Sequence, residues 1–344
     1  MALFRFLILG ATSDALQVSA PRARMRPLRS AEFDSDDVSQ FDLDAICADL
    51  GLTVAAPAAP GAPLERDGAE SLASLASPAA APLAAADLLA FERDGHLCTR
   101  GLFTAAEVAA MAAPVRAIGA REEAAALGHA RDMNDGGDGG APFLQTFNPH
   151  RRSAAAAAIA TCPRLAAVAA QLLGVGALRL YQSCVFVKRA GDEPTNWHSD
   201  LHTSPLDSNA FVTAWFPLHA VEAGGTGLAY ATASHRDLAL AMWQGGQVDA
   251  GDRYAVADHG RYAVGDVSWH HGWCLHGAPA NGGDDDRVAF TVSFFADGGR
   301  IVDEAALAVV NDEDHPSYDA WLGDVDPGGL ADHALLPVVE VPPV

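Results

Sequence analysis

Short apolar runs alternate with turn-forming residues in the second half of the chain. Each run is rich in Val, Phe, Trp, Tyr and Thr and is bounded by Gly, Pro, Asp or Asn, which is the pattern of β-strands. The predicted strands are Leu178–Lys188, Phe211–Leu218, Gly227–Tyr230, Tyr262–Val264, Val267–His270 and Arg287–Phe295. Several short strands separated by Gly-rich turns predict a sandwich or barrel, and a two-sheet jelly roll fits the pattern.

Helical patterns precede these strands. Thr104 and Glu107 have the spacing of a capping box, which predicts a helix over Ala105–Ala120. The Ala-rich segment Ala154–Leu173 predicts a second helix, broken near Pro163. The expected fold is therefore mainly β, with a jelly-roll core and flanking helices.

The N-terminal region shows neither pattern. Residues 1–30 combine a short apolar stretch after Arg5 with several arginines and a single acidic residue, which indicates a possible targeting segment of the signal or transit type. Residues 31–84 are acidic and then rich in Ala and Pro, which predicts a linker that buries little surface. We therefore expect the folded domain over residues 85–340, in a cytoplasmic or organellar protein.

Composition narrows the classes of partner. The 344 residues include 22 basic and 44 acidic side chains, for a net charge of −22, and this disfavours binding to nucleic acid or to anionic membranes. No uninterrupted apolar run reaches the roughly 18 residues that span a bilayer. The five cysteines are scattered and never in CxxC spacing, which indicates reduced thiols.

One short motif carries candidate metal chemistry. On a strand, residues two apart point to the same face, so His198 and Asp200 can offer an imidazole and a carboxylate to one ion. A His-x-Asp pair alone is weak evidence, and a third ligand is needed. Of the three downstream histidines, we choose His276 over His270 and His271, because it precedes a turn that leads directly into the strand beginning at Arg287.

Two histidines and a carboxylate form the facial triad of non-haem Fe(II) oxygenases, which leaves open positions on the ion. Two of these positions would take 2-oxoglutarate and one would take O₂. The far carboxylate of 2-oxoglutarate then needs a planar, bidentate cation, which arginine supplies better than lysine. Arg287 begins an alternating strand and shares its face with small or polar residues, which suits a cation inside a cavity.

At this point the sequence resembles a known family, the phytanoyl-CoA dioxygenase family of Fe(II)/2-oxoglutarate oxygenases, over roughly residues 85–340. The resemblance rests on Phe91–His96, Thr195–Asp200, Phe211–Leu218, Ala233–Arg236, Gly265–Asp266 and His276–Asn281, with Arg287 eleven residues after His276. One departure is the sequence Ala-Thr-Ala-Ser-His at residues 231–235, where the family usually has Pro-Gly-Ser-His.

The resemblance implies a double-stranded β-helix core and assigns roles to the candidate residues. Iron would be bound by His198, Asp200 and His276. Arg287 would bind the C5 carboxylate of 2-oxoglutarate, and Trp215 would flank that pocket. Lys188 stands where the family often carries lysine, and it is the only lysine in the chain, so we expect it to contact the cosubstrate or the substrate.

The expected function is hydroxylation of an unactivated C–H bond in a small-molecule or lipid-like substrate. Two alternatives stay open. One is a cupin-like hydrolase or isomerase that uses Zn²⁺ or another metal in the same site and does not need Arg287. The other is a jelly-roll binding module without catalytic activity.

Overall fold

The strand β12 (Arg287–Ala296) shows how the sequence pattern builds the fold. This computed structural model describes residues 63–77, 82–124, 130–132, 143–238, 250–303 and 315–343. The apolar face of β12 packs into a core, and its other face lines a cavity. The apolar face consists of Val288, Phe290, Val292 and Phe294. The predicted alternation is therefore confirmed, with one face of the strand in the core and the other at the cavity.

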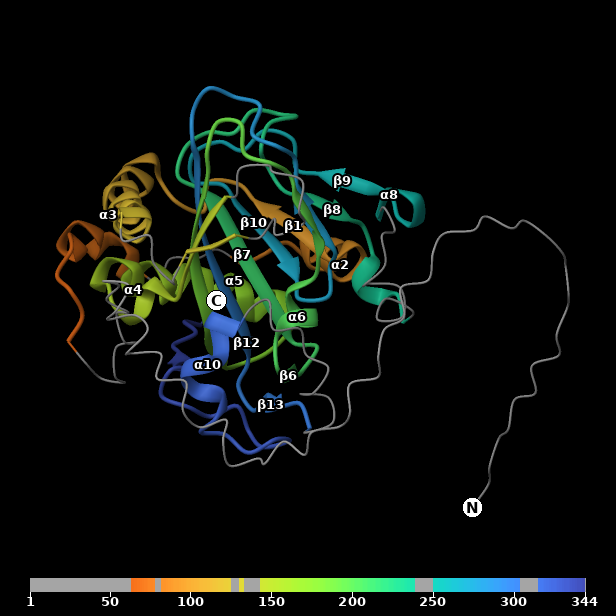
Figure 1. Ribbon diagram of the computed structural model, residues 1–344. Helices are drawn as coiled ribbons and strands as arrows, with labels where there is room; N and C mark the ends of the chain where they lie inside the picture. Colours follow the sequence, from red (N-terminus) through yellow and green to blue (C-terminus); the bar gives the residue numbers. More distant parts are fainter. Residues whose placement is uncertain are drawn as a thin grey trace, which may run out of the picture. The chain divides into compact units, whose positions relative to one another are not determined.

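Within the described residues, β12 lies inside an eight-stranded sheet whose paired strands are antiparallel (Figure 1). The order is β1-β10-β7-β12-β4-β3-β2, and β14 also pairs with β4. The bounds are β1 (His96–Thr99), β2 (Ala130–Asp132), β3 (Leu144–Phe147), β4 (Leu178–Lys188), β7 (Phe211–Pro217), β10 (Val267–His271) and β14 (Val338–Val339).

A four-stranded sheet in the order β5-β11-β8-β9 is formed by β5 (Thr195–His198), β11 (His276–Ala278), β8 (Ala229–Ala231) and β9 (Val256–Asp258). A third, two-stranded sheet consists of β6 (Leu206–Asp207) and β13 (Arg300–Ile301). The predicted strand over Tyr262–Val264 is wrong, because the only β-pairing there is an isolated bridge between Tyr262 and Val221.

Helices cover the outer face of the large sheet (Figure 1). The covering helices are α3 (Ala105–Ala124), α4 (Ala154–Ala160) and α5 (Pro163–Leu173). The predicted capping box is present, because the Thr104 amide donates to Glu107 and the Glu107 amide donates to the Thr104 hydroxyl. The other helical elements are η1 (Ala69–Ala76), α2 (Ala85–Asp94), η2 (Pro149–Arg151), α6 (Asp200–Thr203), η3 (Ser234–Arg236), α8 (Ala250–Arg253) and α10 (His315–Leu322).

The Ala-rich segment is broken where the sequence predicted, between α4 and α5, and Pro163 is the first residue of α5. By length and apolar composition, Ala154–Leu173 is the one stretch among the described residues that could cross a membrane. In this domain 61% of its most apolar window is buried. Its apolar side chains belong to the core against the large sheet.

The region upstream of residue 85 differs from the expectation where it is described. The predicted targeting segment and most of the predicted linker lie outside the described residues. However, η1 falls within the predicted linker, and its Leu72 and Leu75 are buried in the same core as the helices. A 3₁₀ helix has three residues per turn, so two leucines three apart share one face and can pack together. This part of the Ala/Pro-rich stretch is therefore not a linker that buries little surface.

Candidate metal centre and the adjoining cavity

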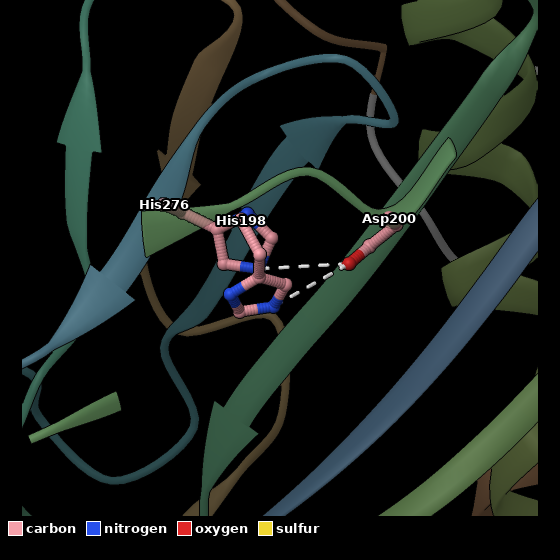
Figure 2. Close-up of side chains that lie close together, drawn as sticks. All are labelled: His198, Asp200 and His276. Atoms are coloured by element: carbon pink, nitrogen blue, oxygen red, sulfur yellow. Dashed lines mark ion pairs between the residues drawn. The ribbon is translucent and has the colours of Figure 1, made fainter. Parts of the chain in front are cut away.

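The side chains of His198, Asp200 and His276 converge beside the four-stranded sheet. His198 ends β5 and pairs in register with His276 at the start of β11, and their rings lie 4.2 Å apart. Asp200 is the first residue of α6. One ligand atom from each of the three side chains lies within 4.8 Å of the others (Figure 2).

The convergence does not arise from the local geometry that we expected. His198 and Asp200 do not share a strand face, because β5 ends at His198 and the chain turns through Ser199 into α6. The turn and the first residue of α6 bring the carboxylate back toward the imidazole. The proximity of His198 and Asp200 was therefore predicted from a shared strand face that the two residues do not have.

Backbone carbonyls orient both imidazoles. The Nδ1 atom of His198 is 2.8 Å from the Asn196 carbonyl oxygen, and that of His276 is 3.0 Å from the Cys274 carbonyl oxygen. When each Nδ1–H donates to its carbonyl, each Nε2 keeps a free lone pair. These two Nε2 atoms lie 3.9 Å and 3.6 Å from Oδ1 of Asp200. Such carbonyl partners fix the tautomer and ring orientation of metal-binding histidines.

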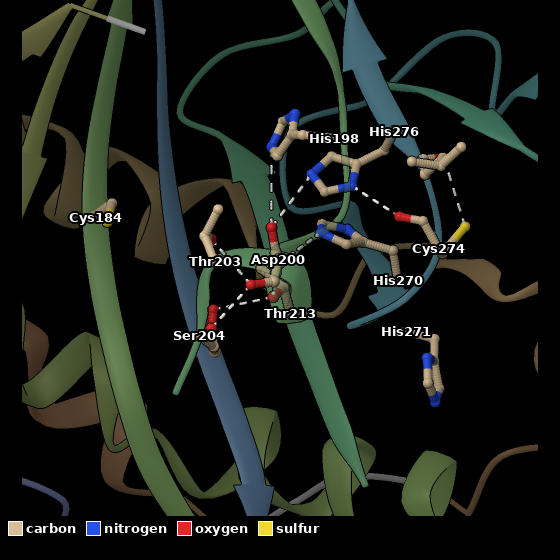
Figure 3. A network of polar contacts seen from close by, with 12 residues as sticks. Cys184, His198, Asp200, Thr203, Ser204, Thr213, His270, His271, Cys274 and His276 are labelled. Carbon is tan, nitrogen blue, oxygen red and sulfur yellow. Dashed lines mark hydrogen bonds and ion pairs between the residues drawn. The ribbon is translucent and has the colours of Figure 1, made fainter. Parts of the chain in front are cut away.

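The second oxygen of Asp200 is held by the protein itself (Figure 3). The Thr213 hydroxyl donates to Oδ2 at 2.5 Å, and Nε2 of His270 lies 3.2 Å from the same oxygen. Thr213 is in turn bonded to Ser293 at 2.9 Å. These contacts leave Oδ1 facing the two imidazoles.

Charge at this centre suits a cation. Burial by itself would raise the pKa of Asp200, but the imidazoles of His276, His270 and His198 outweigh burial and hold the pKa below its usual value. Burial, followed by the charges of His270 and His198, lowers the pKa of His276. An ionised carboxylate beside a neutral imidazole is the protonation state in which these groups bind metals.

Arg287 lines the same cavity as His198, Asp200 and His276, as its strand face predicted. Its side chain is buried, with the residue 3% exposed. Its guanidinium carbon sits 5.3 Å from the centroid of the Trp215 ring. Among the described residues its guanidinium has no hydrogen-bond acceptor, and its Nε is fully buried. Burial lowers the pKa of Arg287 to about 10, partly offset by the charges of Asp192 and Tyr262. The cavity therefore holds a buried cation that has no anionic partner among the residues that the structure describes.

Lys188 lies across from Arg287 in the β4–β12 pair and is fully buried. Its amine donates to the Thr195 hydroxyl at 3.1 Å and to the Pro279 carbonyl at 2.9 Å, and it is not among the residues that line the cavity. Burial, and then the charge of Arg287, lowers the pKa of Lys188 to about 7. The amine thus connects the segments that precede His198 and follow His276, and its predicted contact with cosubstrate or substrate stays a prediction.

Two segments that carried the family resemblance, Phe91–His96 and Ala233–Arg236, contact each other outside the metal centre. The His235 ring lies with Nε2 3.1 Å from the Glu92 carbonyl oxygen in the last turn of α2. A Cβ on Gly95 would lie 2.4 Å from Nδ1 of His235, and Gly95 has a positive φ of 82°. Glycine is therefore required at that position for two independent steric reasons.

Residues of β3 and β4 complete the cavity, and the sequence interpretation had not singled them out. Gln182 and Phe186 share the face of β4 that bears Lys188, so strand alternation was a sufficient signal for them. Phe143 and Gln145 come from β3 and the residue before it, and no local pattern indicated that this segment would pair with β4.

The comparisons with known proteins agree with this geometry. The sequence model of the family "Phytanoyl-CoA dioxygenase (PhyH)" matches residues 91–289, more than half of the chain. The chain belongs to the phytanoyl-CoA dioxygenase family. A search of curated protein sequences gives no significant match.

Solved structures with the same fold include three that are similar over most of the domain. SnoK, a non-heme alpha ketoglutarate dependent carbocyclase from nogalamycin biosynthesis, has a TM-score of 0.62 and 21% identity, and the match covers 75% of this chain and 97% of SnoK. The epimerase SnoN from the same biosynthesis has a TM-score of 0.61 and 22% identity, covering 74% and 97%. EctD from S. alaskensis with bound Fe has a TM-score of 0.53 and 22% identity, covering 64% and 79%. These similarities confirm the expected jelly-roll fold.

Proposed function

We propose that this protein is an Fe(II)/2-oxoglutarate-dependent oxygenase that acts on a small molecule, with His198, Asp200 and His276 as the iron ligands. The observation that carries the proposal is the presence, in one cavity, of three converging ligand atoms and an unpaired buried guanidinium. Structures of SnoN with Fe3+ and alpha ketoglutarate, and of EctD with 2-oxoglutarate and 5-hydroxyectoine, support it by analogy of fold and family.

The residues present fit both groups. Two imidazole nitrogens and one carboxylate oxygen are the donor set of a non-haem Fe(II) site that keeps open positions. The buried guanidinium of Arg287 lacks an acceptor in the described part of the chain, and a carboxylate offers two oxygens in the geometry that a guanidinium binds. The C5 carboxylate of 2-oxoglutarate would therefore supply the missing partner.

Each residue has a distinct role in this proposal. Arg287 binds the far carboxylate, and the face of Trp215 packs against the guanidinium and keeps its direction fixed. Thr213 and His270 hold one oxygen of Asp200 so that the other faces the metal. When bound, iron with 2-oxoglutarate and O₂ supplies the oxidising chemistry, and the protein supplies orientation and the exclusion of water.

The finer proposal is hydroxylation of an unactivated C–H bond. The family resemblance favours it. SnoK and SnoN are a carbocyclase and an epimerase, so the same fold also supports other oxidative outcomes. Incorporation of ¹⁸O from ¹⁸O₂ into the oxidised substrate separates hydroxylation from ring closure or epimerisation. One oxygen atom of O₂ enters succinate in every case, and only hydroxylation places the second atom in the substrate.

The test combines metal analysis with a succinate-release assay on the full chain. We expect one iron per chain after anaerobic loading, and succinate formed from 2-oxoglutarate only when O₂ is admitted. Turnover without O₂ or 2-oxoglutarate would instead identify a hydrolase or isomerase that uses Zn²⁺ or another metal. Failure to bind a divalent metal would identify a binding module without catalytic activity, and either result would overturn the proposal.

A further inference from the structure

One tyrosine lies close to the metal centre but has no role in the proposed function. Tyr230 of β8 pairs in register with His276 of β11, so the two side chains extend from the same face of the four-stranded sheet. The centroid of the His270 ring lies 4.0 Å from that of His276 and 5.9 Å from that of Tyr230. Tyr230 is therefore connected to a metal ligand through a strand pairing and through a single intervening ring.

Two further histidine rings enclose Tyr230, which is 0% exposed. The His96 ring stacks on it, with centroids 4.6 Å apart and planes 11° apart, and the His259 ring lies 5.1 Å away. Burial lowers the pKa of both imidazoles to about 4, so they are uncharged near pH 7. The His96 and His259 rings therefore shield Tyr230 from solvent without placing a charge against it.

The Tyr230 hydroxyl has a hydrogen-bond partner suited to proton transfer. It bonds to the hydroxyl of Ser268 on β10. Burial raises the pKa of Tyr230, so the phenol keeps its proton near neutral pH. A phenol that loses an electron becomes a strong acid, and it forms a neutral radical only if its proton can leave. When Tyr230 donates the bond, Ser268 is the acceptor through which that proton leaves.

From this arrangement we propose that Tyr230 donates an electron to the iron centre when O₂ reacts in the absence of substrate. The inference rests on the proposed function, in which 2-oxoglutarate supplies two of the four electrons that O₂ takes up and the substrate supplies the other two. Without substrate, Fe(II) gives one electron, and Tyr230 gives one electron and its phenolic proton. With one more proton from solvent, the products are succinate, CO₂, water, Fe(III) and a neutral Tyr230 radical.

Tyr230 competes with the rings that line the cavity itself, which are Phe143, Phe186 and Trp215. A phenyl ring is harder to oxidise than a phenol, so Trp215 is the main competitor. Loss of an electron leaves an indole positively charged, and the Arg287 guanidinium, 5.3 Å from the Trp215 ring, disfavours a second positive charge there. Oxidation at Tyr230 thus spares the rings that shape the cavity.

The first test looks for the radical directly. The full chain, loaded with Fe(II) and 2-oxoglutarate under nitrogen and without substrate, is mixed with O₂ and frozen at intervals for electron paramagnetic resonance. We expect a tyrosyl radical signal that narrows when the protein is produced with ring-deuterated tyrosine. This measurement needs no variant, so it does not depend on how a substitution affects folding.

Single tyrosine-to-phenylalanine variants locate the radical, because the chain has only five tyrosines. The signal should be lost in Tyr230→Phe, which keeps the ring and removes only the hydroxyl. It should persist in the variants at Tyr181, Tyr254, Tyr262 and Tyr318. Tyr181→Phe is the matched control, since Tyr181 is also buried, at 1% exposed, but its ring contacts lie in the apolar cluster around Trp321. A signal that persists in Tyr230→Phe, or that disappears in another variant, would overturn the proposal.

A second measurement follows the damage that Tyr230 prevents. After repeated turnover without substrate, mass spectrometry should find more oxygen added to Trp215, Phe143 and Phe186 in Tyr230→Phe than in the wild type or in Tyr181→Phe. The reason is that these rings line the cavity and become the next electron donors. Equal oxidation in the three proteins would show that Tyr230 does not compete with the cavity rings, and it would overturn the proposal.

Succinate release distinguishes this inference from the proposed function. Tyr230→Phe should bind Fe(II) and 2-oxoglutarate under nitrogen as the wild type does, because its hydroxyl contacts Ser268 and no metal ligand. If the wild type forms no succinate when O₂ is admitted, the proposed function is wrong and the role of Tyr230 falls with it. If succinate forms without a tyrosyl signal, only the role of Tyr230 is wrong.

Discussion

Arg164 and Arg287 are two buried arginines with opposite surroundings. Arg164 is 8% exposed, and its guanidinium donates to Glu107 at 2.5 Å and to the Leu102 carbonyl at 3.1 Å, joining α5 to the start of α3. The guanidinium carbon of Arg164 lies 5.1 Å from the centroid of the Phe103 ring. Arg287 is 3% exposed and lies over the Trp215 ring, but it has no acceptor among the described residues. The two residues therefore share burial and ring contact and differ in the presence of an anion.

This difference separates a structural arginine from one that we propose binds a ligand. Burial would lower the pKa of Arg164, but the hydrogen bond to Glu107 outweighs it and the pKa is raised. Burial lowers the pKa of Arg287 to about 10, since no such bond opposes it. An unpaired buried charge is costly, and a bound anion would offset that cost at Arg287.

The largest expected effect comes from Asp200, the anion that shares the cavity with Arg287. Asp200→Ala should abolish iron-dependent succinate release and weaken iron binding by more than about 100-fold, the upper range for residues that only support a ligand. Asp266→Ala is the control, because Asp266 is also buried but pairs with Arg100 and does not line the cavity. Iron affinity retained in Asp200→Ala would remove Asp200 from the metal site.

Arg164→Ala tests the paired side of the comparison. It leaves the Glu107 carboxylate buried without its cation, and we expect a loss of about 3–5 kcal/mol in the free energy of unfolding. The affinity of the folded protein for 2-oxoglutarate should not change. Denaturant titration and calorimetry measure the two quantities, and a large loss of affinity without a loss of stability would contradict the structural role.

Arg287→Ala should show the reverse pattern. Loss of the guanidinium removes the partner of the C5 carboxylate, so 2-oxoglutarate should bind about 30-fold more weakly or worse, from a cost of 2–5 kcal/mol. Stability without ligand should stay the same or increase, since an unpaired charge has been removed. Near wild-type affinity for 2-oxoglutarate would refute the assignment.

Lys188 extends the comparison to a buried cation whose partners are neutral. Its pKa is about 7 in the folded state and about 10.4 in an unfolded chain. Between these values the unfolded state binds more protons, so this group makes the folded state more stable as the pH rises from 7 to 10. Lys188→Met should remove that increase.

The measurement is the difference in unfolding free energy between wild type and Lys188→Met at each pH. The difference is needed because burial raises the pKa of Cys98 and Cys274 to about 12, and these thiols act in the opposite direction. We expect the advantage of the wild type to grow steadily from pH 7 to pH 10. A difference independent of pH would show that Lys188 is charged in the folded protein.

The smallest effect concerns backbone strain, not an unpaired charge. Ala233 has a φ of 66°, in the left-handed region that favours glycine. Ala233→Gly should relieve this strain and stabilise the protein by about 0.5 kcal/mol after the extra freedom of the unfolded chain is counted. Ala231→Gly, at a buried strand position in the same segment, should destabilise it instead.

Local features of this protein follow from the sequence alone. The bounds of β4, the alternating faces of β12, the capping box at Thr104 and the break at Pro163 each depend on residues that are neighbours in the chain. Propensity, side-chain period and capping act over such short distances, so one sequence is enough to predict them. The same reasoning placed Arg287 on the face that lines the cavity.

The arrangement of the site depended on tertiary structure. The sequence indicated which side chains to consider, but the register between β5 and β11 sets the distance between His198 and His276, and the turn into α6 sets the position of Asp200. The pairing of β3 with β4 brought Gln145 into the cavity. Contacts between segments far apart in the chain decide which buried charges and amides find partners, and no local pattern records that outcome.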